Sequence, residues 1–216
     1  MQTTFLFHGP SGCGKDTQVD LLVEQYNFES IGTGEMLRKM LLENDSDAIE
    51  ADKYVSQGKF VPNEIIYRML PKWLDKYDPT KNWAFVSVVR DVGQIPLFDD
   101  LLEKKGRKLD KFVHFTLSEE AAIERMSLRW YCPKCAATYH DKYKPEKEKG
   151  YCTKCSAKLE KREDDQPEKI KERLKEYNRT IQPILEEYRK RGILIEVDAS
   201  PSIDEIHKNV VKVLNL

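Results

Sequence analysis

The stretch FLFHGPSGCGKDTQVDLLVEQY, residues 5–26, decides the fold of this chain. A short apolar run leads into three glycines and a lysine, and apolar residues at helical spacing follow. Gly9, Gly14 and Lys15 have the Gly-x4-Gly-Lys spacing of a Walker A loop, in which backbone N–H groups and a helix N-terminus surround phosphate. The pattern predicts a strand, a phosphate-binding loop and a helix. A glycine-rich turn that only joins strand to helix is the alternative.

Within this loop, Asp16 occupies the position where many phosphate loops carry a magnesium-binding hydroxyl. Mg²⁺ prefers oxygen ligands and typically takes one or two carboxylates with phosphates and water, so Asp16 is a candidate Mg²⁺ ligand. The competing hypothesis is that its charge repels polyphosphate and weakens the protein's activity. Thr17 is a candidate hydroxyl donor to phosphate, whereas Cys13 is expected to be a small filler.

Composition limits the class of protein. The 216 residues suit one large domain or one domain with insertions, and 36 basic residues balance 37 acidic ones. We therefore expect no nucleic-acid or membrane partner recruited by net charge. No apolar run approaches about 18 residues and the start lacks a basic region, so neither a membrane span nor a signal peptide is expected. Four of the five cysteines form tight pairs, which favours a reducing, cytoplasmic location.

Outward from the loop, short apolar runs alternate with amphipathic helical patterns. We expect strands at residues 3–8, 83–88, 111–116 and 193–197, and helices at 17–26, 95–105, 118–128, 167–191 and 202–214. Pro183 is expected to kink the long helix, and Ser202 with Glu205 has capping-box spacing. This alternation predicts an α/β fold with a parallel sheet covered on both faces.

Two segments break this alternation and are expected to project from the sheet as insertions. Residues 32–61 are helical and polar, and residues 129–166 contain the paired cysteines with few apolar side chains. Cys132 and Cys135, then Cys152 and Cys155, have the spacing of a structural four-thiolate zinc site, in which Zn²⁺ substitutes for a core. A nucleic-acid-binding zinc ribbon and a pair of disulfides are the alternatives.

Several dispersed motifs, in order, resemble those of adenylate kinases with a long lid, over essentially the whole chain. The loop resembles GxPGxGKGT, with Asp16 in place of a glycine. The other matching segments are IGTGEMLRKML at 31–41, GKFVPNE at 58–64, REDDQ at 162–166 and RLKEY at 173–177. The resemblance implies a P-loop, five-stranded parallel sheet with a core (1–31, 62–128, 167–216), a monophosphate-binding insertion (32–61) and a zinc-binding lid (129–166).

The resemblance implies Mg²⁺-dependent phosphoryl transfer from ATP to AMP by a monomer. The implied catalytic residues are Lys15, Arg90, Arg129, Arg162 and Arg173. The implied ATP-binding residues are Gly12, Cys13, Gly14, Lys15, Asp16, Thr17, Arg125, Arg129, Tyr139 and His140. Those for AMP are Thr33, Arg38, Lys59, Val61, Arg90 and Gln94. Arginine suits such sites because its planar fork binds two phosphate oxygens and stays ionised. Asp164 and Asp165 are expected to orient the lid arginines or to hinge the lid.

One segment departs from the family pattern. FVSVVR at 85–90 places Val86 where the family carries the aspartate of DGFPR, which organises the water molecules around Mg²⁺. Because valine accepts no hydrogen bond, we hypothesise that the carboxylate near the metal has moved to Asp16. Two alternatives stay open: a kinase for CMP, UMP or GMP, and a nucleotide-binding regulator with weak or no catalysis.

Overall fold

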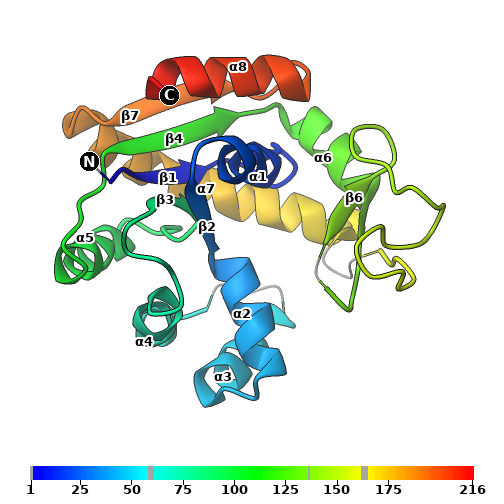
Figure 1. Cartoon of the computed structure of the whole chain (residues 1–216), viewed down its shortest axis with the longest axis horizontal. Coiled ribbons are helices and arrows are strands. Elements are labelled where there is room, and N and C mark those ends of the chain that lie inside the picture. The colour runs from blue at the N-terminus through cyan, green and yellow to red at the C-terminus, as the bar shows by residue number, and fades with distance from the viewer. Residues whose placement is uncertain (1, 58–60, 136, 162–164) are drawn as a thin grey trace.

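The computed structural model describes residues 2–57, 61–135, 137–161 and 165–216. Its centre is a five-stranded sheet with strand order β2-β3-β1-β4-β7, in which every neighbouring pair is parallel (Figure 1). The strands are β1 (Thr4–His8), β2 (Phe28–Gly32), β3 (Asn82–Val86), β4 (Lys111–Thr116) and β7 (Leu194–Asp198). This arrangement confirms the predicted α/β fold. The apolar pattern did not identify β2, which begins and ends near polar residues.

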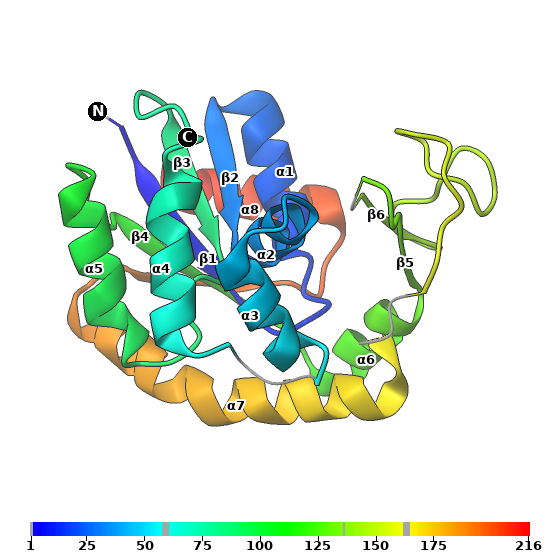
Figure 2. The same ribbon diagram turned by 90° about the horizontal axis from the view of Figure 1, so that it is seen from below.

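Helices cover both faces of the sheet because alternate strand residues on each face are apolar. Phe5 and Phe7 of β1 pack with α1 (Lys15–Gln25) and α8 (Ile203–Leu214). Leu6 lies on the opposite face, in the core that includes α4 (Asn63–Leu74), α5 (Gln94–Lys104) and α7 (Pro167–Lys190). Figure 2 shows α7 running beneath the sheet from α5 to α6 (Glu119–Ser127).

The ends of helices and strands can be compared with those predicted from the sequence. Ser202 and Glu205 form the expected capping box, in which the Glu205 N–H donates to Ser202 Oγ and the Ser202 N–H donates to Glu205 Oε2. Pro183 lies inside α7 without ending it. Strand β3 ends at Val86, earlier than predicted, because Ser87 adopts a φ of 52° and turns the chain.

Two groups of elements project from the sheet, as predicted (Figure 1). The first contains α2 (Thr33–Leu42) and α3 (Ser46–Val55), whose Asp47 accepts a hydrogen bond from Arg68 of α4 at 3.0 Å. The second contains the antiparallel strands β5 (Arg129–Tyr131) and β6 (Thr138–His140). Across the described residues, no helix combines the length and apolar character needed to cross a bilayer.

Candidate active site

The loop between β1 and α1 has the backbone of a phosphate cradle. Gly12 and Gly14 adopt φ of 85° and 84°, a left-handed conformation that favours glycine. A Cβ on Gly12 would lie 2.9 Å from the carbonyl oxygen of Ala122, so α6 approaches the loop closely. Among the described residues no side chain caps the N-terminus of α1, which leaves its first N–H groups available to an anion.

Lys15 and Asp16 lie side by side at the start of α1. Lys15 Nζ is 3.8 Å from Asp16 Oδ2, and the Asp16 side chain is 75% exposed. Desolvation raises the pKa of Asp16, but Lys15, Arg129 and Arg38 together lower it below its usual value. Asp16 is therefore an ionised oxygen donor at the mouth of the loop. Val86, at the end of β3, is buried in the apolar cluster with Phe7, and its side chain supplies no oxygen.

Cys13 lies in the same loop and is fully buried. Burial raises the pKa of its thiol, so Cys13 is neutral and packs in the cradle, as expected of a filler. A Cβ on Gly9 would lie 2.8 Å from Cys13 Sγ. The loop is therefore tightly packed around Gly9 and Cys13.

A buried carboxylate joins two of the predicted arginines to this loop. Asp165 is 2% exposed, and it accepts hydrogen bonds from Arg129 Nε at 2.8 Å and Nη2 at 2.6 Å. Arg173 Nη1 lies 3.4 Å from Asp165, while its Nη2 donates to Ser11 Oγ at 3.0 Å. The predicted orienting role of Asp165 is thus consistent with its contacts. Arg162 and Asp164 lie outside the described residues.

A second group of predicted residues surrounds the backbone carbonyl of Ser87. Arg90 Nε donates to this oxygen at 3.1 Å and Thr33 Oγ1 at 3.4 Å. The backbone N–H of Arg90 donates to Gln94 Oε1 at 2.7 Å. The turn after β3 therefore brings together residues predicted to bind AMP from α2, α5 and the turn itself.

Three further residues were predicted to bind AMP. Val61 is half-buried and packs against the core that includes α4 and α5. Arg38, on α2, lies close enough to Asp16 to lower the pKa of that carboxyl group, which links the second group to the phosphate loop. Lys59 lies outside the described residues.

Arg125 and His140, predicted at the ATP base, are connected by an aromatic ring that the sequence analysis missed. The Arg125 guanidinium lies over the Tyr143 ring at 5.4 Å, and the ring centroids of His140 and Tyr143 are 4.7 Å apart. Burial lowers the pKa of His140 and favours the neutral imidazole. The sequence feature that could have identified Tyr143 is the presence of an aromatic residue three positions after His140.

Tyr139 faces the interior of the lid instead. It is 6% exposed, its hydroxyl lies 3.2 Å from Cys152 Sγ, and it accepts a hydrogen bond from the Thr153 N–H at 2.8 Å. These contacts connect Tyr139 to the cysteine cluster. Its part in ATP binding stays a prediction.

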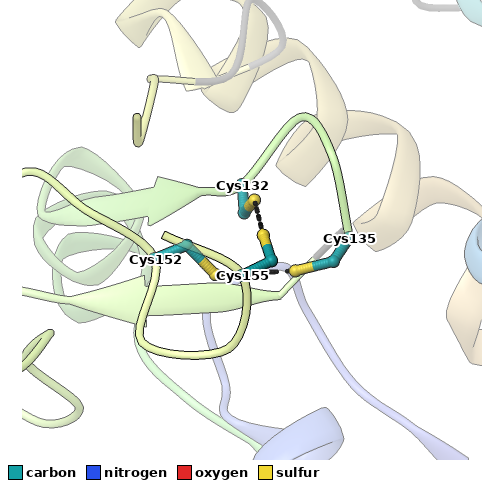
Figure 3. Close-up of side chains that lie close together, drawn as sticks. All are labelled: Cys132, Cys135, Cys152 and Cys155. Atoms are coloured by element: carbon teal, nitrogen blue, oxygen red, sulfur yellow. Dashed lines mark hydrogen bonds between the residues drawn. The ribbon is translucent and has the colours of Figure 1, made fainter. Parts of the chain in front are cut away.

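The four cysteines of the two pairs converge at one point, as Figure 3 shows. Their sulfur atoms all lie within 4.8 Å of one another; Cys132 and Cys155 are 3.4 Å apart, and Cys135 and Cys152 are 3.5 Å apart. In a tetrahedral site with Zn–S bonds of about 2.3 Å, the sulfurs lie about 3.8 Å apart. The cluster has the ligand type, number and spacing of a structural zinc site.

Thiolate formation is favoured at one member of this cluster. Burial raises the pKa of Cys152, but hydrogen bonds from Tyr139 and from the backbone of Lys154 and Cys155 lower it to about 6. All four thiols are free, at distances well beyond the 2.05 Å of an S–S bond. The donor set therefore fits Zn²⁺.

Comparison with known proteins identifies relatives across nearly the whole chain. The family model described as adenylate kinase matches residues 7–193. An adenylate kinase of Archaeoglobus fulgidus is 32% identical over 209 residues, which cover 97% of this chain and 96% of the relative. Adenylate kinases of Caldanaerobacter subterraneus and Clostridium beijerinckii are each 34% identical over 206 residues, covering 95% of this chain and 93% and 95% of those relatives.

Proposed function

This chain belongs to the adenylate kinase family, and from that premise we propose that it transfers a phosphoryl group reversibly from ATP to AMP, giving two ADP. It is a nucleoside monophosphate kinase, and its Mg²⁺ arrives with ATP. The observation that carries the proposal is the hydrogen-bonded link from Arg129 through Asp165 and Arg173 to Ser11 of the phosphate loop. This link draws cationic groups from two separate elements toward the phosphate cradle.

Charge stabilisation supplies most of the catalysis in this proposal. Lys15, Arg129, Arg162 and Arg173 surround the transferred group and neutralise the charge that spreads over its oxygens. Arg38 and Arg90 bind the AMP phosphate, and Thr33, Val61 and Gln94 line its base pocket. The acceptor phosphate is already anionic, so no strong base is required. Arg125 and His140 contact the ATP base.

Closure of the two projecting segments protects the reaction from water. Residues 32–61 form the monophosphate-binding insertion and residues 129–166 the lid, on a core made of the remaining residues. When both close over the nucleotides, phosphoryl transfer to AMP is favoured over hydrolysis. We propose a monomer in the cytoplasm, a compartment that keeps the paired cysteines reduced.

The decisive experiment is a coupled assay of ADP formation with AMP, CMP, UMP and GMP as acceptors. Turnover with AMP supports adenylate kinase activity. A preference for another monophosphate would change the proposed acceptor but leave the proposed reaction, phosphoryl transfer from ATP, unchanged. The Asp16 carboxylate and the apolar side chain of Val86 favour one further candidate, a nucleotide-binding regulator. Nucleotide binding without ADP formation from any acceptor would establish it.

Asp16 is the side chain proposed to face Mg²⁺. Its exposed, ionised oxygen is adjacent to Lys15, and Mg²⁺ bound to nucleotide phosphates takes carboxylate ligands directly or through water. Asp16→Gly is expected to lower the rate at least tenfold and to weaken its dependence on Mg²⁺. Calorimetric binding of ATP with and without Mg²⁺ provides a readout independent of turnover. Faster turnover of Asp16→Gly would instead indicate that the carboxylate repels phosphate.

The four cysteines are proposed to hold one Zn²⁺ with a structural role. All four tetrahedral positions are taken by Cys132, Cys135, Cys152 and Cys155, so no position is left for an activated water. Metal analysis of protein purified under reducing, metal-replete conditions should give about one zinc per chain. A clearly lower content would contradict the site.

A further inference from the structure

The side-chain amide of Gln94 is held at both ends. Gln94 is the first residue of α5 and is 6% exposed. Its Oε1 accepts a hydrogen bond from the Arg90 N–H at 2.7 Å, and its Nε2 donates to Asn63 Oδ1 at 2.7 Å. Because Asn63 is the first residue of α4, these bonds join two helix N-termini at one buried amide.

The chemistry of the two partners determines which way this amide faces. A glutamine amide is ordinarily ambiguous, since its oxygen and nitrogen can exchange places. Here a backbone N–H, which can only donate, faces one end, so that end must be the Oε1 acceptor. The reversed amide would place two donors against each other in a buried site and leave both unsatisfied. Asn63 then completes the arrangement by accepting from Nε2.

An amide fixed in this way can form two further hydrogen bonds of known direction. One lone pair of Oε1 and one N–H of Nε2 are still able to bond. A 6-aminopurine offers the complementary pair, an amino donor next to a ring-nitrogen acceptor, which glutamine binds through two hydrogen bonds. A 6-oxopurine has an acceptor in place of the amino group, and this acceptor would face the oxygen Oε1.

We propose that Asn63 is a positioning residue for base selection. The Arg90 N–H sets which way the Gln94 amide faces, and Asn63 holds its Nε2 end in the place where the amide accepts a 6-aminopurine monophosphate. This inference rests on the proposed function, in which Gln94 contacts the base of the acceptor nucleotide. It adds a residue that touches neither nucleotide in the proposed reaction. It also gives a reason why the enzyme should prefer AMP to the 6-oxo analogue IMP, which has the same ribose and phosphate.

The test compares Asn63→Ala with Asn63→Asp, using kcat/KM for AMP and for IMP. Asn63→Ala removes the acceptor and is expected to lower the AMP/IMP ratio about fivefold, the loss typical of one hydrogen bond. The KM for AMP should rise, whereas the KM for ATP and kcat at saturating AMP should not change. Asn63→Asp keeps an acceptor oxygen of the same shape and should retain the wild-type ratio within about twofold.

Tyr67→Phe is the matched control. Tyr67 Oη donates to the backbone carbonyl of Gln94 at 3.1 Å, so this variant removes a bond to the same residue but not to its amide. Its AMP/IMP ratio should equal that of the wild type. An unchanged ratio in Asn63→Ala, or an equal loss in Tyr67→Phe, would overturn the inference.

Two further outcomes separate this inference from the proposed function. If urea titrations show that Asn63→Ala is unfolded, Asn63→Thr replaces it. The threonine hydroxyl is too short to reach Gln94 Nε2, so the same AMP/IMP ratio is expected. Wild-type protein that forms no ADP from AMP would contradict the proposed function itself and, with it, the role of Asn63. Wild-type turnover of AMP with no effect of Asn63→Ala contradicts only the role of Asn63.

Discussion

At the scale of single residues, Asp165 bears on both the stability of the protein and its proposed active site. Its carboxylate is almost fully buried, and both partners are arginines that are only 22% and 29% exposed. A buried charge is stabilised only by partners placed in good geometry, and removal of one member of a buried ion pair is strongly destabilising. The same hydrogen bonds hold Arg129 and Arg173, so we expect both stability and the proposed catalysis to depend on this side chain.

We predict that Asp165→Ala lowers the free energy of unfolding by about 3 kcal/mol, because two guanidinium groups lose their shared counterion. It should also lower kcat/KM at least tenfold, since the arginines lose alignment. Urea titration and the coupled assay measure the two effects. Asp99→Ala is the control: Asp99 pairs with Arg191 at 2.7 Å at a half-exposed position and should cost less than about 1 kcal/mol. Equal losses in both variants would contradict the prediction.

His8, which precedes the first glycine of the phosphate loop, is a buried histidine. It is 5% exposed, and its ring stacks on those of Phe112 and Tyr177, with centroids 5.9 and 5.7 Å away. Neither ring nitrogen has a hydrogen-bond partner within the described part of the chain. Burial first, and then the charges of Lys15 and Arg90 and the neighbouring His114, lower the pKa of His8 well below its usual value; the Val89 backbone acts in the opposite direction.

A neutral buried histidine makes stability depend on pH. Below about pH 6.5 the unfolded chain binds a proton at His8 that the folded protein does not, so stability falls as pH falls. We predict that His8→Leu reduces this slope by up to about 1.4 kcal/mol per pH unit between pH 6 and 5, the limit for one proton. Urea titrations across this range measure the slope, which is independent of any packing difference. An unchanged slope would contradict the assignment.

At the scale of elements, the lid shows how a segment with few apolar residues acquires a core. Tyr139 and Leu159 are its largest buried side chains, and both pack around Cys132 and Cys152. The Tyr139 hydroxyl contacts Cys152 Sγ and accepts from the Thr153 N–H. In the proposed zinc site, a group in this position would orient Cys152 and tune its affinity for the metal.

We predict that Tyr139→Phe weakens zinc binding about tenfold, because Cys152 loses its hydrogen-bond donor. Competition with a zinc-binding dye measures the affinity. Tyr151→Phe, at a 45% exposed position in the same lid, is the control and should bind zinc as the wild type does. Equal affinities of all three proteins would show that Tyr139 only fills space.

At the scale of the whole molecule, the phosphate loop lies between two projecting parts. Arg129 at the base of the lid and Arg38 on α2 both act on the pKa of Asp16, so each part presents a cation to the loop. Lys144 of the lid also lies 3.5 Å from Asp20 of α1. This arrangement suits two nucleotides that meet with their phosphates facing each other across the loop.

We predict that a bisubstrate mimic, two adenosines joined through five phosphates, stabilises the protein more than ATP or AMP at the same concentration. At 1,000 times its dissociation constant, a ligand that binds only the folded protein contributes about 4 kcal/mol. Thermal unfolding with each ligand measures the difference. If the mimic stabilises no more than ATP alone, the two nucleotide sites do not face each other.

Part of this organisation was readable from local pattern. The Gly-x4-Gly-Lys spacing, the alternation of strands and helices, the paired cysteines and the capping box at Ser202 each involve residues close in sequence, and all have counterparts in the structure. Strand β2 was missed because its sequence FESIG alternates weakly, and its burial is determined by β3 beside it and by the helices packed against it.

The sequence by itself determined the loop, the class of fold and the cysteines that form the candidate zinc site, because backbone periodicity and the spacing within each cysteine pair are local properties. Tertiary structure alone decided that Asp165 connects two arginines, that Tyr143 lies between Arg125 and His140, and that Asn63 holds Gln94. These contacts join residues up to tens of positions apart. They depend on strand order and helix packing, which bring distant side chains within hydrogen-bond distance only after the sheet has formed.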